Sequence, residues 1–377
     1  MQKFLLLFSW SLFRALCFGL LLFPLALQAK EKIIIGYLPL WKEWNIQDIQ
    51  DSSFNVLQIS FLSIKHDQVF LEAEYKEKFK NSIEKLQAIK KKNPNLQIVV
   101  SIGGWGVDGF SHAASNKRTR KKFAKSIIST IQTYNLDGID LDWEFPVHGG
   151  GNIIGYTKDK ENLTLLLAEI RNELDKIQQK NHKLYSLSVA VSVAPWVVDT
   201  IEFKNVLLYA DYIGLMAYNL AGGWGQYSGH HAPLFRHDSN WATSDIVTAL
   251  LQEGVDSNQI IFGIPFYGRY LDNVPNVNHG LHQPFSGTAG ISSLTYQQIT
   301  TDYLSNPNFK RYYDKRAKAE FLYSKKQQVF ITYMGPKSLK EIMKYVNKQQ
   351  LLGIMIWEIT QDDENKDLTN LAYKMLK

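Results

Sequence analysis

The sequence predicts an α/β protein, a (β/α)₈ TIM barrel with a small α+β domain inserted between strand 7 and helix 7. Two observations lead to this prediction. Eight short, nearly continuous apolar segments alternate with amphipathic stretches, a pattern typical of a parallel sheet covered by helices. The alternation stops after the seventh apolar segment and resumes roughly 65 residues later, which indicates an insertion into the repeating unit.

The eight apolar segments are rich in Ile, Val, Phe and Tyr, the residues that favour strands. The predicted strands are Ile33–Trp41, Phe54–Ile64, Gln97–Trp105, Leu136–Pro146, Tyr185–Trp196, Ala210–Leu220, Gln259–Arg269 and Leu351–Ile359. Eight parallel strands are the number that closes such a barrel.

The stretches between the strands carry apolar residues on one face at helical spacing. Such stripes run over Phe79–Ile89, Phe123–Tyr134 and Leu163–Ile177. A further stripe follows Ser338, whose hydroxyl we expect to cap the helix that it opens. We expect these faces to cover the outside of the barrel.

The interruption defines the expected domains. Residues 270–334 contain Pro, Gly, Asn and Tyr together with strand-like pieces such as Gln328–Tyr333. We assign residues 270–334 to the α+β insertion, and residues 30–269 and 335–377 to the barrel.

The first 29 residues resemble an export signal. Lys3 supplies a positive start, a long apolar stretch follows, and Ala29 offers a small residue for cleavage. Arg14 interrupts the apolar run, so an uncleaved membrane anchor stays open as the alternative. We expect a secreted or periplasmic protein with no membrane association after cleavage. The single cysteine, Cys17, lies in this segment, so the mature chain would have no disulfide and no thiolate metal site.

The composition is that of a globular protein, because 45% apolar and 21% charged residues exclude a disordered or collagen-like chain. Lys and Arg (42) exceed Asp and Glu (36), which gives a net charge of +6. The basic run Lys90–Lys92 closes a predicted helix, where positive side chains favour the helix dipole. We therefore expect no nucleic-acid partner. The 13% of aromatic residues indicate either a groove that stacks flat ligands or a ring-rich core.

The segment Leu136–Pro146 is the most informative in the chain. Alternate residues of a strand share a face, so Asp140, Asp142 and Glu144 point one way and the apolar residues between them point the other. Three carboxyl groups on the inner face of one strand are costly, because like charges disfavour joint ionisation and burial disfavours it further. A structural strand would carry Val, Ile or Leu there, so the pattern indicates a functional site.

The position of each carboxyl group suggests its chemistry. Glu144 comes last, at the C-terminal rim where barrel active sites lie. Asp142 would share a proton with it at neutral pH, and a carboxylic acid held protonated can serve as a general acid. Asp140 lies deeper and can redirect that proton. A glycosidase acid is the favoured hypothesis, and a Mg²⁺-type metal site and a structural charge network are the alternatives.

This strand and its neighbours resemble glycoside hydrolase family 18, the chitinase family. The resemblance covers Ile33 to Asp363, and the full signature Asp-x-x-Asp-x-Asp-x-Glu occupies Asp137–Glu144. The other matching pieces are Ile34–Trp41 with Tyr37, Phe61, Ser101–Trp105, Met216–Asn219, Pro265–Arg269, and Gly353–Glu358 with Trp357. The insertion that follows Arg269 is similar to one that deepens the groove in a subgroup of chitinases.

The resemblance implies a substrate-assisted retaining mechanism on β-1,4-linked N-acetylglucosamine units, as in chitin or chitooligosaccharides. Glu144 would protonate the glycosidic oxygen, and the sugar's own acetamido carbonyl would attack the anomeric carbon. Asp142 would orient the acetamido group, with Asp140 behind it, and Tyr218 would hydrogen-bond to it. The mechanism needs no metal and no cofactor, and we expect the protein to act as a monomer.

The resemblance also implies a set of substrate-binding residues. These are Tyr37, Phe61, Gly104, Trp105, Met216, Asn219, Tyr267, Arg269 and Trp357. Trp357 would form the floor under the cleaved sugar, and Trp105 and Tyr37 would stack on sugars. Each has a structural alternative: the rings of Tyr37, Phe61 and Trp357 can fill the barrel, Tyr267 and Arg269 can form a structural stack and ion pair, and the glycines can permit close backbone approach.

Two further points bear on function. Trp224, His230 and His231 follow the sixth predicted strand. They belong either to a surface loop without a function or, in the case of Trp224, to the wall of the groove. Asn219 stands where the family motif often has Asp; it can still donate a hydrogen bond, but the missing charge puts the pH profile in doubt. The rival functions are a non-catalytic chitin- or glycan-binding lectin, a hydrolase of another N-acetylglucosamine glycan such as peptidoglycan, and a metal-dependent barrel enzyme.

Overall fold

The structure is a computed structural model that describes residues 31–45, 49, 53–237 and 241–377. These residues all belong to one unit, Glu31–Lys377. The expected export signal, residues 1–29, lies outside the described residues. Within the described ranges, no helix combines the length and the apolar character needed to cross a membrane.

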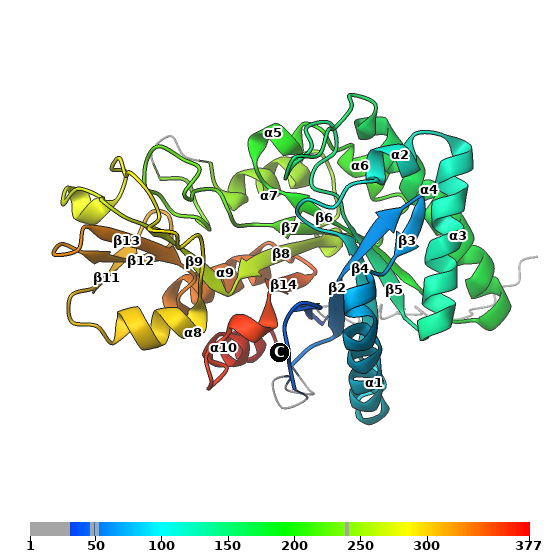
Figure 1. Cartoon of the computed structure of the whole chain (residues 1–377), viewed down its shortest axis with the longest axis horizontal. Helices are drawn as coiled ribbons and strands as arrows, with labels where there is room; N and C mark the ends of the chain where they lie inside the picture. Colours follow the sequence, from blue (N-terminus) through cyan, green and yellow to red (C-terminus); the bar gives the residue numbers. More distant parts are fainter. Residues whose placement is uncertain (1–30, 46–48, 50–52, 238–240) are drawn as a thin grey trace, which may run out of the picture. The chain divides into compact units, whose positions relative to one another are not determined.

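Eight parallel strands form a closed barrel, which confirms the predicted fold class (Figure 1). The order β1-β14-β8-β7-β6-β5-β4-β2 is closed by pairing of β1 with β2. The strands are β1 (Ile33–Pro39), β2 (Val56–Lys65), β4 (Gln97–Gly103), β5 (Gly138–Asp142), β6 (Ser186–Ser192), β7 (Tyr212–Met216), β8 (Ile260–Pro265) and β14 (Gly353–Trp357). Most of them end earlier than predicted, for example at Asp142 rather than Pro146. Most of the residues beyond these ends form rim loops, but Pro195 and Trp196 begin a short helix and Tyr267–Arg269 belong to a further strand.

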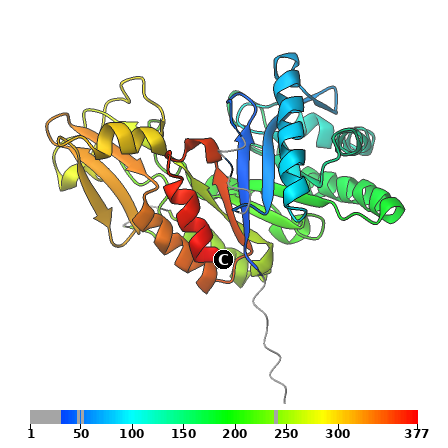
Figure 2. The same ribbon diagram turned by 90° about the horizontal axis from the view of Figure 1, so that it is seen from below.

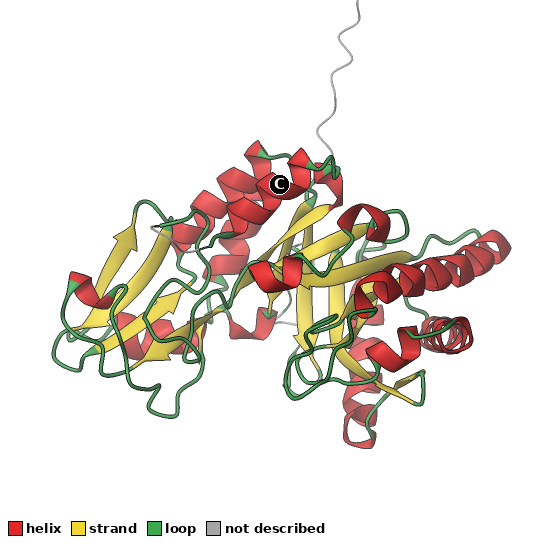
Figure 3. Ribbon diagram, turned by 90° about the horizontal axis from the view of Figure 1, so that it is seen from above, coloured by secondary structure: helices red, strands yellow, loops and turns green. Residues whose placement is uncertain are grey.

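The helices lie outside the ring of strands (Figure 2 and Figure 3). The longer ones are α1 (Lys76–Lys92), α3 (Lys117–Tyr134), α4 (Asp159–Asn181), α7 (Thr243–Gln252), α9 (Pro336–Lys348) and α10 (Asp367–Leu376). The short helix α2 (Phe110–Ala114) precedes α3, and the short helices α5 (Pro195–Val198) and α6 (Phe203–Val206) lie between β6 and β7. The predicted apolar stripes are buried, as at Phe79, Leu86, Phe123 and Leu166, because each helix turns one apolar face to the strands.

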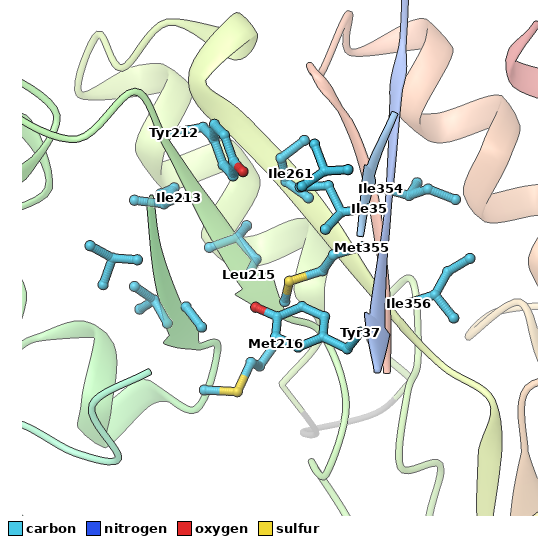
Figure 4. Close-up of a cluster of buried hydrophobic side chains, with 14 of the residues drawn as sticks. Ile35, Tyr37, Tyr212, Ile213, Leu215, Met216, Ile261, Ile354, Met355 and Ile356 are labelled. Atoms are coloured by element: carbon cyan, nitrogen blue, oxygen red, sulfur yellow. The ribbon is translucent and has the colours of Figure 1, made fainter. Parts of the chain in front are cut away.

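The interior of the barrel is packed with side chains from opposite strands. Figure 4 shows Tyr37, Met216 and Met355 meeting between β1, β7 and β14. Gly214 makes this packing possible, because a Cβ atom there would lie 2.6 Å from the Met355 sulfur. A barrel filled in this way leaves room for a ligand only at its end.

A second, antiparallel sheet follows β8 and precedes α9 (Figure 1). Its order is β10-β9-β13-β12-β11. The strands are β9 (Tyr267–Leu271), β10 (Leu294–Thr295), β11 (Lys310–Asp314), β12 (Ala319–Ser324) and β13 (Val329–Tyr333), with the short helix α8 (Tyr296–Gln298). Strand β9 begins before the expected boundary at residue 270, and a separate domain over residues 270–334 stays a prediction.

The start of helix α9 differs from the sequence prediction. The helix begins at Pro336, so Ser338 lies inside its first turn and does not cap it. Instead, the carboxylate of Glu320 on β12 accepts hydrogen bonds from the backbone N–H groups of Lys337 (2.8 Å) and Ser338 (3.0 Å). The Ser338 hydroxyl accepts a bond from the Glu320 N–H in return. A cap supplied by a residue distant in the sequence cannot be recognised from the residues around the helix start. The local sequence there offers only Ser338, a residue type that often caps helices.

Candidate active site

A groove with a volume of about 1730 Å³ lies at the C-terminal ends of the barrel strands. Pockets for single drug-sized ligands hold roughly 300–1,000 Å³, so this groove has room for several sugar rings. Its lining is rich in aromatic side chains. They are Trp41, Phe61, Tyr75, Trp105, Phe145, Trp196, Tyr218, Trp224, Tyr227, Trp241, Tyr267 and Trp357.

Asp142 and Glu144 both line this groove. Asp142 is the last residue of β5, and Glu144 lies in the loop that follows. Burial raises the pKa of Asp142 well above its usual range, and the neighbouring Glu144 and Asp140 charges raise it further. Burial also raises the pKa of Glu144, to about 7. The pair therefore holds a proton near neutral pH, as a general acid requires.

Asp140 lies below this pair and is almost fully buried. Strand register places Ser101 of β4 and Ser188 of β6 beside it. Their hydroxyls donate hydrogen bonds of 2.7 and 2.6 Å to its carboxylate, and Tyr37 donates a third of 3.1 Å. Burial raises the pKa of Asp140, although these donors oppose the rise. Asp140 thus supports the pair from beneath and does not line the groove.

Asp137, the first carboxylate of the signature, lies outside the groove. Its carboxylate accepts a bond from the Ile98 N–H (2.7 Å) and pairs with Lys90 (2.5 Å) and Lys183 (3.0 Å). Burial alone would raise its pKa, but the Ile98 bond and the two lysines hold the pKa below its usual value. Lys90, expected only as a solvated helix end, therefore ties α1 to the start of β5.

Replacing Asp137 by Asn is expected to destabilise the fold by about 1–2 kcal/mol at pH 7 and to leave kcat unchanged, because the lost ion pairs are partly exposed. The native pKa is lowered, so this stabilisation is present above the unfolded pKa of roughly 3.9 and is lost as pH falls through the native value. Urea unfolding of both proteins at pH 7 and at about pH 3.5 checks this. Equal stabilities at pH 7 would contradict it.

Tyr218 follows β7 and faces the groove beside the carboxyl pair. Its ring packs edge-on against Tyr267, with centroids 6.0 Å apart. Burial, followed by the proximity of Tyr267 and the carboxyl groups, raises its pKa well above its usual range. The hydroxyl therefore remains protonated and able to donate a hydrogen bond. Met216, at the end of β7, also lines the groove.

One end of the site is a stack of aromatic rings. Phe61 and Trp357 stack with centroids 5.4 Å apart and planes 19° apart. Trp41 stacks on Phe61 at 6.2 Å and is 46% exposed. Trp41 is not among the site residues predicted from the sequence. Its position at the end of the first predicted strand, where barrel sites lie, was the available signal.

Tyr37 and Gly104 are placed differently from Phe61 and Trp357. Tyr37 is buried, and its hydroxyl joins Asp140 and Gln58. It does not line the groove, so the structure favours the alternative in which its ring fills the barrel. A Cβ atom on Gly104 would lie 2.5 Å from the Phe61 ring. Only a glycine at position 104 leaves room for the Phe61 ring. This agrees with the alternative in which Gly104 permits close packing and does not bind the substrate.

A second aromatic group lies around the loop after β5. Trp105 is 65% exposed and packs edge-on against Phe145, which in turn packs edge-on against Trp196. Trp105 is a predicted site residue. Trp196, which is half exposed and also lines the groove, is not among the predicted ones. Trp196 is the last residue of the fifth predicted strand. Its place at a C-terminal strand end therefore indicates a site residue, as for Trp41.

Asn219, Tyr267 and Arg269 form one hydrogen-bonded group on the groove wall. The Asn219 side-chain oxygen accepts bonds from the Tyr267 hydroxyl (2.8 Å) and from Arg269 Nη2 (2.7 Å) and Nε (3.2 Å). We expected Asn219 to donate, but both neighbours offer donors, so its amide oxygen serves as acceptor. The Arg269 guanidinium lies over the Trp224 ring at 5.1 Å, which places Trp224 in the groove.

His230 and His231 have structural surroundings. His230 bonds to Asp314 of β11 at 3.0 Å, and the buried His231 ring packs on Tyr267. Burial, followed by Arg269, lowers the pKa of His231 well below its usual value, so this ring is neutral. Within the part of the chain that the structure describes, no group of three or more His, Cys, Asp or Glu side chains is arranged to hold a metal ion.

A closed (β/α)₈ barrel with a protonated carboxyl pair in an aromatic groove is the arrangement of a glycoside hydrolase. Comparison with known proteins agrees with this class. The chain belongs to the glycosyl hydrolases family 18, whose family model matches residues 33–362.

Individual relatives are similar over most of this chain. Chitinase A1 of Niallia circulans is 32% identical over 309 residues, which cover 77% of this chain and 44% of the relative. Endochitinase 1 of Metarhizium robertsii is 32% identical over 297 residues, or 76% of this chain and 66% of the relative. The chain thus spans less than two thirds of the length of these relatives.

Solved structures show the same fold. A family 18 N-acetylglucosaminidase from Paenibacillus barengoltzii has a TM-score of 0.84 at 30% identity, covering 91% of this chain and 99% of that chain. A class V chitinase mutant from Nicotiana tobaccum, in complex with NAG4, has a TM-score of 0.83 at 25% identity, covering 92% and 99%.

Proposed function

We propose that the protein hydrolyses β-1,4 linkages between N-acetylglucosamine units of chitin or chitooligosaccharides by a substrate-assisted retaining mechanism. The observation that carries this proposal is the Asp142–Glu144 pair, whose raised pKa values keep a proton inside an aromatic groove. Relatives named as chitinases, and a structural neighbour in complex with NAG4, support the choice of sugar.

In the first step Glu144 donates its proton to the glycosidic oxygen while the bond to the anomeric carbon breaks. The carbonyl oxygen of the sugar's acetamido group forms the new bond to that carbon and gives a positively charged oxazolinium. Asp142 accepts the acetamido N–H and stabilises this charge, and the Tyr218 hydroxyl donates to the same group. In the second step the Glu144 carboxylate takes a proton from water, and the water oxygen bonds to the anomeric carbon as the bond from that carbon to the acetamido oxygen breaks, with net retention.

The stacked rings of Phe61 and Trp357 supply the platform for the sugar that reacts. Their centroids lie 5.4 Å apart in nearly parallel planes, and both rings line the same groove as the carboxyl pair. The apolar face of a sugar ring covers such a platform without directional bonds. The carboxyl groups and Tyr218 then set its orientation.

We also propose that the protein is exported and acts outside the cytoplasm as a monomer. The sequence pattern of residues 1–29 supports export, and an insoluble polymer is accessible only to an exported enzyme.

Product release tests the proposed function directly. The purified protein is incubated with N-acetyl-chitooligosaccharides of defined length, and the products are separated and weighed by mass spectrometry. We expect shorter oligosaccharides that retain their acetyl groups. Binding without products would favour the lectin hypothesis, cleavage of peptidoglycan strands alone would favour a different glycan, and loss of activity on chelation would favour a metal-dependent enzyme.

The pH profile gives a second prediction. The Glu144 acid must be protonated in the first step, and its pKa is raised to about 7. We therefore expect kcat/KM to fall about tenfold per pH unit above roughly pH 7. Initial rates between pH 5 and 9 measure this limb, with Asp137→Asn as a control that should retain it. A flat profile across this range would contradict the assignment of the acid.

A further inference from the structure

Arg269 is a cation on the groove wall whose contacts are all neutral. Its guanidinium bonds to the Asn219 amide oxygen and to the Ser292 carbonyl oxygen (2.9 Å), and it lies over the rings of Tyr267 and Trp224. Within the described ranges, no carboxylate oxygen lies within ion-pair distance of it. A charge in this position is not neutralised by the protein.

Two of its N–H groups also remain available. A guanidinium carries five N–H donors in a planar fork. Nε, one N–H of Nη1 and one N–H of Nη2 are used by Asn219 and Ser292. The other two have no acceptor among the residues that the structure describes, and the side chain is part of the groove lining. Charged N–H donors without an acceptor favour an anionic group such as a carboxylate.

Trp224 determines which part of a ligand meets this charge. The Arg269 guanidinium lies 5.1 Å from the centre of the Trp224 ring, and Trp224 is 62% exposed. A Cβ atom on Gly222 would lie 2.4 Å from the same ring, so the loop backbone approaches Trp224 closely. A sugar that packs against the exposed part of Trp224 in the groove is therefore near the guanidinium.

The other charged residues of the groove do not cancel this local field. Arg269 is the one Arg or Lys among the described groove-lining residues, and the acidic ones are Glu72, Asp142 and Glu144. Glu72 follows β3 (Gln68–Phe70), and its carboxylate accepts a hydrogen bond from Ser63 on β2. Arg269 lies on β9, a different part of the fold. Asp142 and Glu144 hold one proton between them near neutral pH, so the pair does not carry its full negative charge.

We propose that Arg269 selects by charge the sugar that stacks on Trp224, so that a carboxylate-bearing sugar binds there better than N-acetylglucosamine, and a sugar with a free ammonium group binds worse. The inference rests on the proposed function, because it deepens the substrate choice of the same groove. It depends on Asn219: an aspartate in its place would supply the anionic partner that Arg269 lacks. The backbone φ of Asn219 is +61°, a conformation that Asn and Asp both tolerate, so this exchange fits the loop.

Binding to the Glu144→Gln variant tests the proposal without turnover. The probes are the N-acetylglucosamine tetramer, tetramers in which one unit at a time carries a C6 carboxylate, and tetramers in which one unit at a time carries a free amine. We expect one carboxylate position to bind roughly three- to tenfold more tightly than the neutral tetramer in calorimetry. The amine at the same position should bind more weakly, and both effects should shrink at 1 M salt.

Matched variants attribute the effect to the guanidinium. In the same background, Asn219→Asp and Arg269→Gln should both abolish the preference, and Arg269→Lys should retain part of it. The proposal is overturned if every carboxylate tetramer binds like the neutral one, or if the preference persists in Asn219→Asp. Cleavage of the neutral tetramer by the wild-type protein is scored separately, so a failure of the proposed function is distinguished from a failure of charge selection.

Discussion

Glu144→Gln is expected to lower kcat by a factor of about 10³–10⁴ while oligosaccharide binding stays within roughly threefold of wild type. The glutamine amide has nearly the shape of the carboxyl group, but its N–H protons are not acidic enough to be transferred to the glycosidic oxygen. It also cannot take a proton from water in the second step. Because both steps depend on this one residue, the loss falls on kcat.

The measurement compares product release and calorimetric binding for the two proteins with the same chitooligosaccharide. Asp137→Asn serves as the matched control, since it also exchanges a carboxylate for an amide on the same segment but lies outside the groove. A Glu144→Gln variant with a rate near that of the wild type would refute the assignment of the acid. Loss of binding together with turnover would show that the residue holds the substrate.

Asp142→Asn is expected to lower kcat by a smaller factor, about 10²–10³, with little change in KM. The carboxylate of Asp142 is needed to orient the acetamido group and to stabilise the positive oxazolinium, and the amide carries no charge. Its Oδ1 atom is buried without a hydrogen-bond partner among the described residues, so the group is not fixed by the protein on that side. Single-turnover kinetics on a chitooligosaccharide separate the chemical step from binding. A large rise in KM with unchanged kcat would contradict this role.

Most of the barrel strands were predictable because each strand's own residues reveal that it is buried. Strands such as Ile33–Pro39 and Gln97–Gly103 consist almost wholly of apolar residues, as strands buried on both faces must. Their C-terminal ends were less well predicted, because the rim loops also begin with apolar residues. In this protein those extra residues, such as Trp41 and Trp196, line the groove.

Side chains of the candidate site were predictable where strand alternation determines their direction. Contacts with residues that are distant in the sequence were not predictable. Alternation brings Asp140, Asp142 and Glu144 to one face, and that set lies together in the structure. Alternation also puts Asp137 on the other face, but its ion pairs depend on Lys90 and Lys183, which are far from it in the sequence. The Asn219 amide oxygen accepts hydrogen bonds because of two donors on β9, and the sequence does not show that they meet.

The hydrogen bonds from the start of α9 to the Glu320 carboxylate limit how the smaller sheet can be exchanged between homologous barrels. The smaller sheet contributes to the groove wall through Tyr267 and Arg269, whereas the carboxyl groups belong to β5 and the loop after it, so a chimera could replace the wall and leave the chemistry in place. However, the same segment supplies the acceptor for the first N–H groups of α9. A graft without an equivalent carboxylate would start that barrel helix uncapped, at a cost of about 1 kcal/mol. Successful transplants of this segment should therefore be those that bring their own acceptor.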